Sequence, residues 1–267
     1  MNARRSPLLR FALPLVVLAA VIGAWQFGTS LAPSFFFPTA TTIGETIVED
    51  YFSGPPAHLF LGEAVFTQVV PSLGRLLAGW AIGSIIGVVL GFAIGLLPRL
   101  ADYVDPVLQF LRSMPPPVII PLYLVLFGIG DGMKILFIAT GVLWPILLNT
   151  IDGVRNVPPT QLDTTRIFRI GIADRLLRVV LPSAAPKIFA GLSIGMAIAI
   201  VIMVLSEMVA ATNGIGFLIL QGQRGFRLPE MWAGVVVLGV LGFLLNSVLL
   251  FIEHRVLTWH RRSKGLI

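Results

Sequence analysis

Long apolar runs constrain this chain more than any other feature. A helix that crosses the hydrocarbon core of a bilayer needs about 20 mostly apolar residues, and six windows of the sequence meet this requirement. Their edges lie near residues 9–29, 73–97, 105–128, 132–151, 186–211 and 231–252. Of all residues, 56% are hydrophobic and 12% are charged, against about 25% charged in ordinary soluble domains. The sequence therefore predicts one all-α polytopic membrane domain with six transmembrane helices over residues 1–267.

The basic residues indicate how the predicted spans are oriented. With a cytoplasmic N-terminus, most of the 19 Lys and Arg residues fall on the cytoplasmic side, and those outside are Arg75, Lys134, Arg224 and Arg227. The external segment 30–72 carries acids but no Lys or Arg. The positive-inside rule predicts a multi-pass protein of the bacterial inner membrane, with both termini and the loop 152–185 in the cytoplasm. Because the basic residues are spread between apolar runs, we expect no nucleic-acid partner.

The first apolar run permits two interpretations. The charged start MNARRSPLLR resembles the beginning of a signal peptide. However, the apolar run continues to Phe27, and it carries Trp25 and Gln26 near its far end, where an interfacial anchor would lie. A retained signal anchor is favoured, and a cleaved signal peptide is the alternative.

Glycines recur at every fourth residue of the second span. They are Gly79, Gly83, Gly87, Gly91 and Gly95. Small residues let helices approach closely in lipid, where hydrophobic burial does little to drive helix association. Because four residues advance the helix face by about 40°, we expect a crossing helix to pack along only part of this stripe. Static packing is the favoured role, and a sliding contact is the alternative.

Prolines interrupt the third span. They are Pro115, Pro116, Pro117 and Pro121. Proline lacks an N–H and disfavours the α conformation of the preceding residue, so we expect a kink here. Backbone groups freed at membrane depth are tolerated only beside protein or a water-filled cavity, which makes this span a candidate cavity wall. Arg112, just before the break, is expected to extend to the cytoplasmic interface.

Motifs for nucleotide binding and hydrolysis are absent from the sequence. It contains no P-loop and no Gly-Lys dipeptide, and His58, His254 and His260 lack the spacing of metal ligands. An intramembrane hydrolase would need a nucleophile with a base, or paired acids, at membrane depth. We therefore expect no catalytic residue, no metal and no cofactor on this chain itself.

The cytoplasmic stretch QLDTTRIFRIGIADRLLRVVLPSAAPK is charged and helix-prone. Pro158 and Pro159 separate it from the fourth span, and its apolar residues alternate with charged ones, which predicts an amphipathic segment. Asp174 is expected to cap a second short helix that ends at Pro182. One interpretation is a surface helix in the lipid headgroups, and the other is a docking helix for a cytoplasmic partner.

The residues LDTTRIFR, followed by VVLP, resemble the EAA loop in the membrane subunits of binding-protein-dependent ABC importers. The stretches SLGRLLAGWAIGSIIGVVLGFAIGL, DPVLQFLRSMPPPVIIPLYLVLFGIGD, ILLNTIDGVRNVPP and SEMVAATNGIGFLI are similar to the nitrate, sulfonate and taurine branch of that family. One departure is Arg169, which stands where the family usually has Gly. The bend of the loop is therefore expected at Gly171.

The resemblance implies the fold of a type I ABC importer and the function of its permease subunit, for a small anionic solute such as a sulfonate, taurine or nitrate. It implies a second permease copy in a homodimer, two ABC ATPase subunits that hold ATP and Mg, and an extracytoplasmic binding protein. The EAA loop would form the coupling helix, with Leu162 and Phe168 as its apolar anchors. The coupling residues expected from the resemblance are Leu162, Asp163, Thr164, Thr165, Arg166, Phe168, Arg169 and Gly171.

Glu207 is the acidic residue that lies well within a predicted span. An ionisable group at that depth marks a functional site by default, so Glu207 is a candidate for the translocation path or its gate. Capping of a neighbouring helix is the alternative. Met203, Ser206 and Asn246 are the further candidates for the path.

A self-contained secondary transporter is the alternative function. Such a protein would couple to ions through intramembrane acids, and it often contains an inverted repeat. The single membrane acid and the lack of an evident repeat favour the ABC permease.

Overall fold

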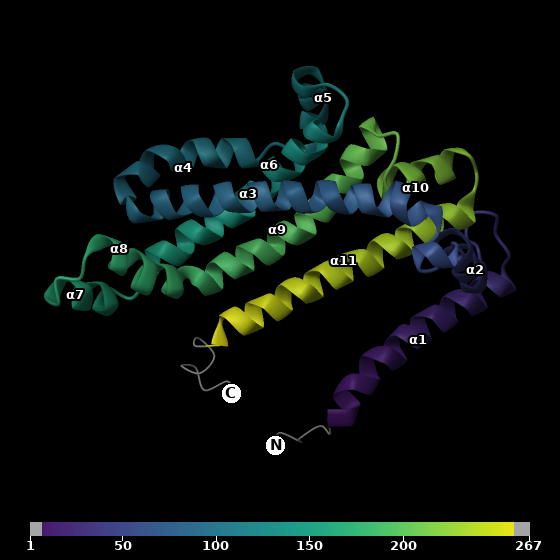
Figure 1. Ribbon diagram of the computed structural model, residues 1–267, viewed down its shortest axis with the longest axis horizontal. Helices are drawn as coiled ribbons and strands as arrows, with labels where there is room; N and C mark the ends of the chain where they lie inside the picture. The colour runs from purple at the N-terminus through teal and green to yellow at the C-terminus, as the bar shows by residue number, and fades with distance from the viewer. Residues whose placement is uncertain (1–6, 259–267) are drawn as a thin grey trace. The chain divides into compact units, whose positions relative to one another are not determined.

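The computed structural model of the protein describes residues 7–258, and within this range it contains helices and no β-strand (Figure 1). Arg4, Arg5, Arg261, Arg262 and Lys264, which contribute to the predicted orientation, lie outside the described residues. The helices are α1 (Pro7–Leu31), α2 (Ala40–Phe52), α3 (Val70–Leu96), α4 (Pro98–Arg112), α5 (Pro116–Phe127), α6 (Asp131–Arg155), α7 (Pro159–Ile167), α8 (Ile172–Arg175), α9 (Leu181–Ala210), α10 (Ile215–Arg224) and α11 (Leu228–Val256). Among the described residues, five helices are long and apolar enough to cross a membrane, or six if a bent pair is counted as one span. The predicted all-α membrane class is confirmed.

The chain forms two compact units. The first unit comprises the chain through Gln68 together with Leu218–Val237. In this unit the indole N–H of Trp25 donates to the carbonyl of Pro38 at 3.0 Å, and that of Trp232 donates to the carbonyl of Phe36 at 3.1 Å. The two indole rings lie 5.0 Å apart, so an aromatic cluster with satisfied N–H groups holds this unit together.

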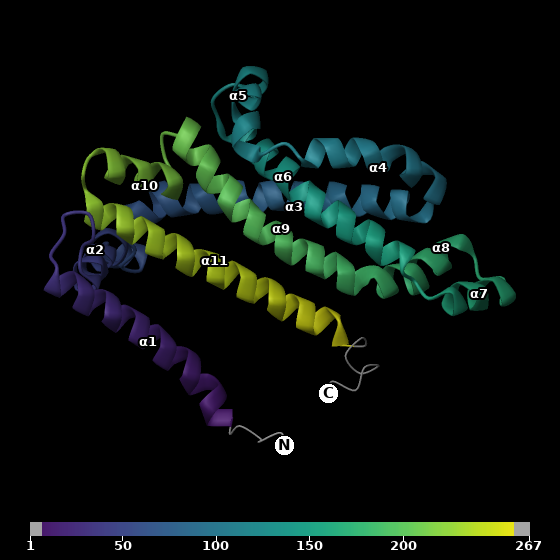
Figure 2. The ribbon, with the colours of Figure 1, turned by 180° about the vertical axis from the view of Figure 1, so that it is seen from behind.

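The second unit, Val69–Phe217 with the chain from Leu238 onward, contains the main helix bundle. Helices α3, α6 and α9 lie side by side in both views (Figures 1 and 2), and α6 contacts the other two. Ile138, Val142 and Ile146 of α6 are fully buried in the largest apolar cluster. Because its apolar face is covered from two sides, α6 is the central element of this unit.

All five glycines of the α3 stripe face α6. A Cβ built on Gly83 would lie 2.5 Å from the carbonyl oxygen of Ala139, and a Cβ on Gly95 would lie 2.8 Å from the side chain of Val154. The prediction that a neighbour packs along only part of the stripe is therefore wrong. The two helices run in the same direction, and a small-residue repeat longer than 3.6 residues stays in contact when the helices wind around each other.

The proline run breaks the third predicted span completely. Helix α4 ends at Arg112, α5 begins at Pro116, and the segments Pro106–Arg112 and Pro116–Phe127 are bent by 91°. Consecutive prolines supply no N–H to continue the helix, and each disfavours the α conformation of the residue before it. The predicted kink is confirmed at its position, and the bend is large enough that α5 stands out from the long helices of the unit (Figure 2).

The helix that was expected to stop at Pro182 continues through it. Helix α8, a π-turn at Leu176–Val180 and α9 follow one another directly, forming one helical stretch from Ile172 to Ala210. The predicted stop is wrong because Pro182 falls in the first turn of α9, where its missing N–H is tolerated, and the wider π-turn before it makes room for the ring. Asp174 lies in the first turn of α8 but does not cap it, since Gly171 occupies the N-cap position.

Replacing Gly83 by Ala should loosen the α3–α6 contact. The added methyl would meet backbone atoms of Ala139, and overpacking of this kind costs about 1–3 kcal/mol. We expect a lower melting temperature for the Gly83→Ala variant in detergent, measured by fluorescence-detected gel filtration after heating. Gly74→Ala on the same helix is the matched control, because a Cβ there meets nothing within 4 Å. Equal melting of both variants would contradict the close contact.

Candidate functional site

The loop that carries helices α7 and α8, residues 159–175, lies at one end of the second unit, beyond the end of α6 and next to the start of α9 (Figure 1). Helix α7 begins at Pro159, where the missing N–H is harmless because the first turn of a helix has no acceptor for it. The residues expected at the ATPase contact all lie on this α7–α8 loop. The structure thus presents them together at one end of the bundle.

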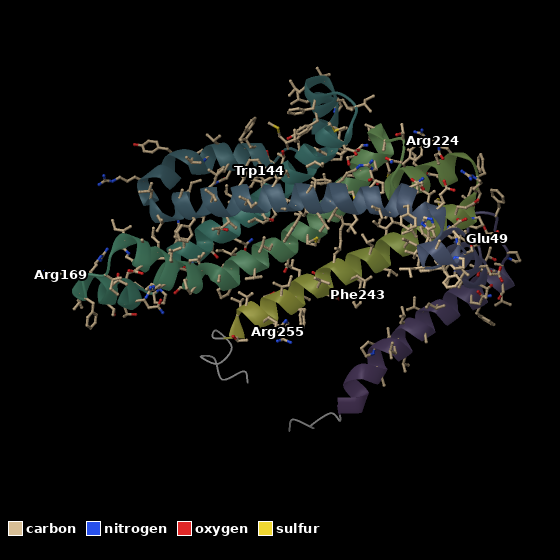
Figure 3. The ribbon with its side chains drawn as sticks, viewed as in Figure 1. Glu49, Trp144, Arg169, Arg224, Phe243 and Arg255 are labelled. Atoms are coloured by element: carbon tan, nitrogen blue, oxygen red, sulfur yellow. The ribbon has the colours of Figure 1, made fainter. Side chains whose placement is uncertain are left out.

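A Schellman turn ends α7, and Arg169 is its left-handed residue. The φ angle of Arg169 is +50°. Its N–H donates to the carbonyl of Arg166 at 3.1 Å, and the N–H of Ile170 donates to that of Thr165 at 2.9 Å. Gly171 has φ −59° and ψ 153°, which any residue can adopt, so the bend predicted at Gly171 is wrong. Arg169 takes the conformation that glycine adopts most easily, and its side chain lies at the far end of the loop (Figure 3).

The two faces of the α7–α8 loop differ in accessibility. Ile167, Phe168 and Ile172 are 77%, 73% and 78% exposed and form an apolar tip. Leu162 instead packs against the cluster of Val154, Val157, Val180, Ala184 and Ile188, and Thr165 is buried with its hydroxyl donating to the carbonyl of Leu162 at 2.7 Å. Leu162 therefore anchors the loop to its own bundle. Its role as an anchor for a partner stays a prediction, as does that of Phe168, whose side chain is exposed at the tip.

Two ion pairs of the loop and its continuation are exposed and join near neighbours. Arg166 lies 2.9 Å from Asp163, and Arg178 lies 2.9 Å from Asp174. Thr164 donates its hydroxyl to the carbonyl of Thr160. Exposed pairs one helical turn apart contribute little to stability, so these charges can exchange partners when another protein binds.

The loop is tied to the bundle by a hydrogen bond, in which the hydroxyl of Ser183 on α9 donates to the side-chain oxygen of Gln161 on α7 at 2.9 Å. Lys187 of α9 and Asp152 of α6 pair at 2.7 Å and join the two helices between which the loop lies. The helical stretch from Ile172 runs into α9 without a gap. The second half of the loop is therefore continuous with α9.

A buried ionic network lies where α3 begins and α9 ends. Arg75 of α3 is 4% exposed, and its Nη1 donates to Oε1 of Glu207 at 2.7 Å. Its Nε donates to Asp131, the first residue of α6, at 2.8 Å, and its Nη1 also reaches the carbonyl of Asn213 at 3.1 Å. Together with Ser72, these residues form what we call the Arg75 network, and they join the ends of α3, α6 and α9 to the start of α10.

Glu207 is completely buried, and both of its carboxylate oxygens are occupied. Oε1 accepts from Arg75, Oε2 accepts from the N–H of Gly216 at 3.0 Å, and the hydroxyl of Ser72 lies within 2.9 Å of both oxygens. The same hydroxyl accepts from the N–H of Ile215 at 2.9 Å. Ser72 and Glu207 thus satisfy free N–H groups at the start of α10. These contacts favour the capping role of Glu207, and its place on a translocation path stays a prediction.

The other path candidates differ in position. Met203 and Ser206 are buried, and the Ser206 hydroxyl donates to the carbonyl of Met203 at 2.7 Å. Asn246 of α11 is exposed. The structure brings Met203, Ser206 and Glu207 together on α9 and does not bring Asn246 to them in any contact among the described residues.

The sequence reasoning missed Arg75, Ser72, Asp131 and Asn213. Arg75 was counted only as an external charge. The signal that could have identified it is its position inside an apolar run, because an arginine there needs an acidic partner. Asp131 and Glu207 lie on the same predicted side of the membrane as Arg75 and could supply that partner.

Comparisons with known proteins agree with this geometry. A model of the family described as binding-protein-dependent transport system inner membrane component matches residues 83–258, which include the whole α7–α8 loop. The putative aliphatic sulfonates transport permease protein SsuC of Bacillus subtilis is 28% identical over 94% of this chain and 88% of its own length. The bicarbonate transport system permease protein CmpB of Synechococcus elongatus is 33% identical over 74% of this chain and 71% of its own length. The fold resembles the inward facing MetNI methionine ABC transporter, with a TM-score of 0.58 and 22% identity over 70% of this chain and 95% of that chain.

Replacing Arg169 by Gly should stabilise the end of α7 by about 1 kcal/mol, because glycine adopts a left-handed conformation without the steric cost of a side chain. We expect slower hydrogen exchange at the amide of Ile170, which closes the Schellman turn. Gly171→Ala is the control and should leave that exchange rate unchanged, since a Cβ at Gly171 meets nothing within 4 Å. A loss of protection in Gly171→Ala but not in Arg169→Gly would place the bend at Gly171 instead.

Replacing Glu207 by Gln keeps the shape of the side chain and removes its charge. Arg75 would then be buried with the exposed Asp131 as its nearest carboxylate, and breaking a buried ion pair costs about 3–5 kcal/mol. We expect the melting temperature in detergent to fall markedly. Asp163→Asn makes the same chemical change in an exposed pair and should have little effect. If both variants melt like the wild type, the network does not hold the helix ends together.

Proposed function

The chain belongs to the family of binding-protein-dependent transport system inner membrane components, and from this premise we propose that it works as a homodimeric importer permease driven by two separate ABC ATPase subunits. The observation that carries this proposal is the apolar tip of the α7–α8 loop. Ile167, Phe168 and Ile172 are more than 70% exposed on a loop that is otherwise charged. Apolar residues in such a position are stabilised when a partner covers them, and an aromatic anchor is the usual energetic centre of an interface.

The proposed orientation places the α7–α8 loop in the cytoplasm of a bacterium, with the protein in the inner membrane. The distribution of Lys and Arg supports it by the positive-inside rule. ATP and Mg would bind to the ATPase subunits, in keeping with the lack of a P-loop in this chain. An extracytoplasmic binding protein would deliver the solute from the opposite side.

The solute that we propose is a small anion. The names of the relatives support this class, since aliphatic sulfonates and bicarbonate both carry negative charge. A second copy of the chain would complete the path. Helix α5 supports the dimer because it turns away from the bundle and leaves Val118 72% exposed and Val125 83% exposed.

The geometry suggests how the ATPase would drive the permease. Closure of the ATPase subunits would displace the α7–α8 loop, and the helical stretch from Ile172 to Ala210 would carry that displacement through the membrane. Leu162 and the hydrogen bond between Ser183 and Gln161 would keep the loop and the bundle together during the movement. The permease would therefore respond by tilting its long helices, not by local refolding of the loop.

Replacing Phe168 by Asp should release the ATPase and leave the permease folded. The substitution puts a charge into the apolar tip, whereas the exposed position of Phe168 means that the bundle loses little packing. We expect at least a tenfold loss of ATPase recovered with affinity-purified permease. Gel filtration of the permease alone should show a wild-type profile.

Phe168→Leu is the matched control, because it keeps an apolar side chain at the tip and should retain most of the bound ATPase. Recovery of the ATPase at wild-type yield with Phe168→Asp would show that docking does not use this tip. Solute uptake by proteoliposomes that contain the chain without any ATPase would refute the proposed function as a whole.

A further inference from the structure

A closed loop, residues 53–62, follows α2 directly and belongs to the first unit. Its two ends approach each other so closely that side chains would not fit. A Cβ on Gly54 would collide with the carbonyl oxygen of Leu61, and a Cβ on Gly62 would collide with that of Asp50. The base of the loop is therefore a tight backbone contact that requires glycine.

The tip of this loop is strained. Leu59 has a φ angle of +54° and Phe60 one of +62°, in the left-handed region that glycine adopts freely and that costs energy for residues with a side chain. The N–H of Leu59 donates to the carbonyl of Pro56 at 3.1 Å, and that of Phe60 donates to the carbonyl of Pro55 at 3.4 Å, as in a Schellman turn. The loop thus has glycine where space requires it, and bulky residues where the backbone conformation favours glycine.

The two strained residues are large, apolar and accessible. Leu59 is 82% exposed and Phe60 is 61% exposed. The ring of His58 makes an edge-to-face contact with that of Phe66, with the centroids 5.4 Å apart, which helps to fix the loop. Strained backbone clusters at functional sites, and exposed apolar patches mark interaction surfaces. We call Leu59 and Phe60 the Leu59 tip.

The chain around the Leu59 tip is acidic. The external segment 30–72 contains four acids and no Lys or Arg. One exposed face of α2 combines two of these acids with apolar side chains, and it consists of Glu45, Val48, Glu49 and Phe52 (Glu49 is labelled in Figure 3). Burial, and then the carboxylates of Glu230 and Glu49, raise the pKa of Asp50, although Arg227 acts in the opposite direction. Negative charge is therefore concentrated next to the loop.

This charge argues against two partners. A second copy of the chain in an isologous contact would place the same acids opposite each other. A lipid surface would bring phosphates near them, which repel carboxylates.

The length of the next helix also argues against lipid. The helical stretch Val65–Leu96 has 32 residues and is about 48 Å long, against about 30 Å for the hydrocarbon core. Arg75 lies ten residues, or about 15 Å, from its first residue. In the proposed orientation, the start of this stretch therefore stands outside the hydrocarbon core, and the loop precedes it.

We propose that the Leu59 tip docks the soluble extracytoplasmic binding protein by inserting Leu59 and Phe60 into an apolar pocket that Lys or Arg side chains of that protein surround. This surface rests on the proposed function and specifies one of its contacts. A rigid loop loses little conformational freedom on binding, so the buried tip supplies affinity. The acids of α2 attract the basic residues and speed the approach of the two proteins.

The test uses the complex of permease and ATPase in lipid nanodiscs. The binding protein of the same transport system is added with a mixture of nitrate, bicarbonate, taurine and an aliphatic sulfonate. We expect the double variant Leu59→Asn/Phe60→Asn to bind it at least tenfold more weakly, and half-maximal stimulation of ATP hydrolysis to need correspondingly more of it. Asparagine tolerates the left-handed conformation, so the melting temperature should stay at or above the wild-type value. A lowered melting temperature would assign the tip a structural role and overturn the proposal.

Phe226→Asn is the matched control. Phe226 is also aromatic, 63% exposed and left-handed, with a φ angle of +54°, and it belongs to the same unit. It precedes Arg227 and follows Arg224 by two residues, so its neighbours carry the charge that a basic partner avoids. We expect this variant to bind like the wild type. An equal loss of binding would overturn the assignment to the Leu59 tip.

The double variant Glu45→Gln/Glu49→Gln tests the charge. Both acids are exposed, so the fold should be little affected. We expect the binding protein to associate several-fold more slowly at low ionic strength, and the difference to vanish at about 1 M salt, where the screening length is about 3 Å. An unchanged association rate at low ionic strength would contradict a basic partner.

Phe60→Trp reports what covers the tip. Its emission, after subtraction of the wild-type spectrum, should be that of an indole in water and should shift to shorter wavelength when the binding protein is added. Quenching by brominated lipids before that addition would assign the tip to the lipid interface and overturn the proposal.

The outcomes separate the docking surface from the function. Wild-type binding and wild-type stimulation of ATP hydrolysis in Leu59→Asn/Phe60→Asn would overturn the docking surface and leave the importer intact. A wild-type complex whose ATP hydrolysis the loaded binding protein does not stimulate would refute the proposed function itself.

Discussion

The second unit depends on how closely α3 approaches α6. In lipid the hydrophobic effect does not favour helix contacts, so van der Waals contact between well-fitted surfaces must hold them together. The glycine stripe supplies this contact from Gly79 to Gly95. Glycines act in the same way between α6 and α9, where a Cβ on Gly191 would lie 2.9 Å from Asn149. Helix α6 thus contacts glycine-containing surfaces of α3 and α9 on two sides.

This three-helix block connects the two ends at which polar chemistry is concentrated. At one end the α7–α8 loop exposes apolar residues and exchangeable ion pairs. At the other end Arg75 and Glu207 are buried and hydrogen-bonded within the Arg75 network. The contrast has a physical reason. A surface that meets a partner needs accessible groups, whereas charges next to the membrane need hydrogen-bond partners within the protein.

The sequence allowed the helices to be located because lipid demands long apolar stretches, and the proline run predicted the break between α4 and α5. It did not predict the bend of the α7–α8 loop, because Gly171 seemed the natural residue for a positive φ. The turn instead follows the carbonyls at the end of α7, which fix its position at Arg169. The packing of Leu162 against its own bundle was not predicted, because an amphipathic pattern shows which residues are apolar, not which of two neighbours will cover them. The Arg75 network was harder to predict for a different reason. Arg75 and Glu207 are 132 residues apart in the chain, and only the apolar run around Arg75 indicates that it needs an acidic partner.

The Arg75 network has a consequence for where a permease of this kind can open. Four helix ends meet in it through bonds to a single guanidinium and a single carboxylate. The ends of α3 and α9 cannot separate without leaving the buried Arg75 and Glu207 unpaired. These bonds therefore hold the helix ends of each chain together. In the homodimer that we propose, a passage would therefore form between the two copies, while the helix ends within each copy stay together.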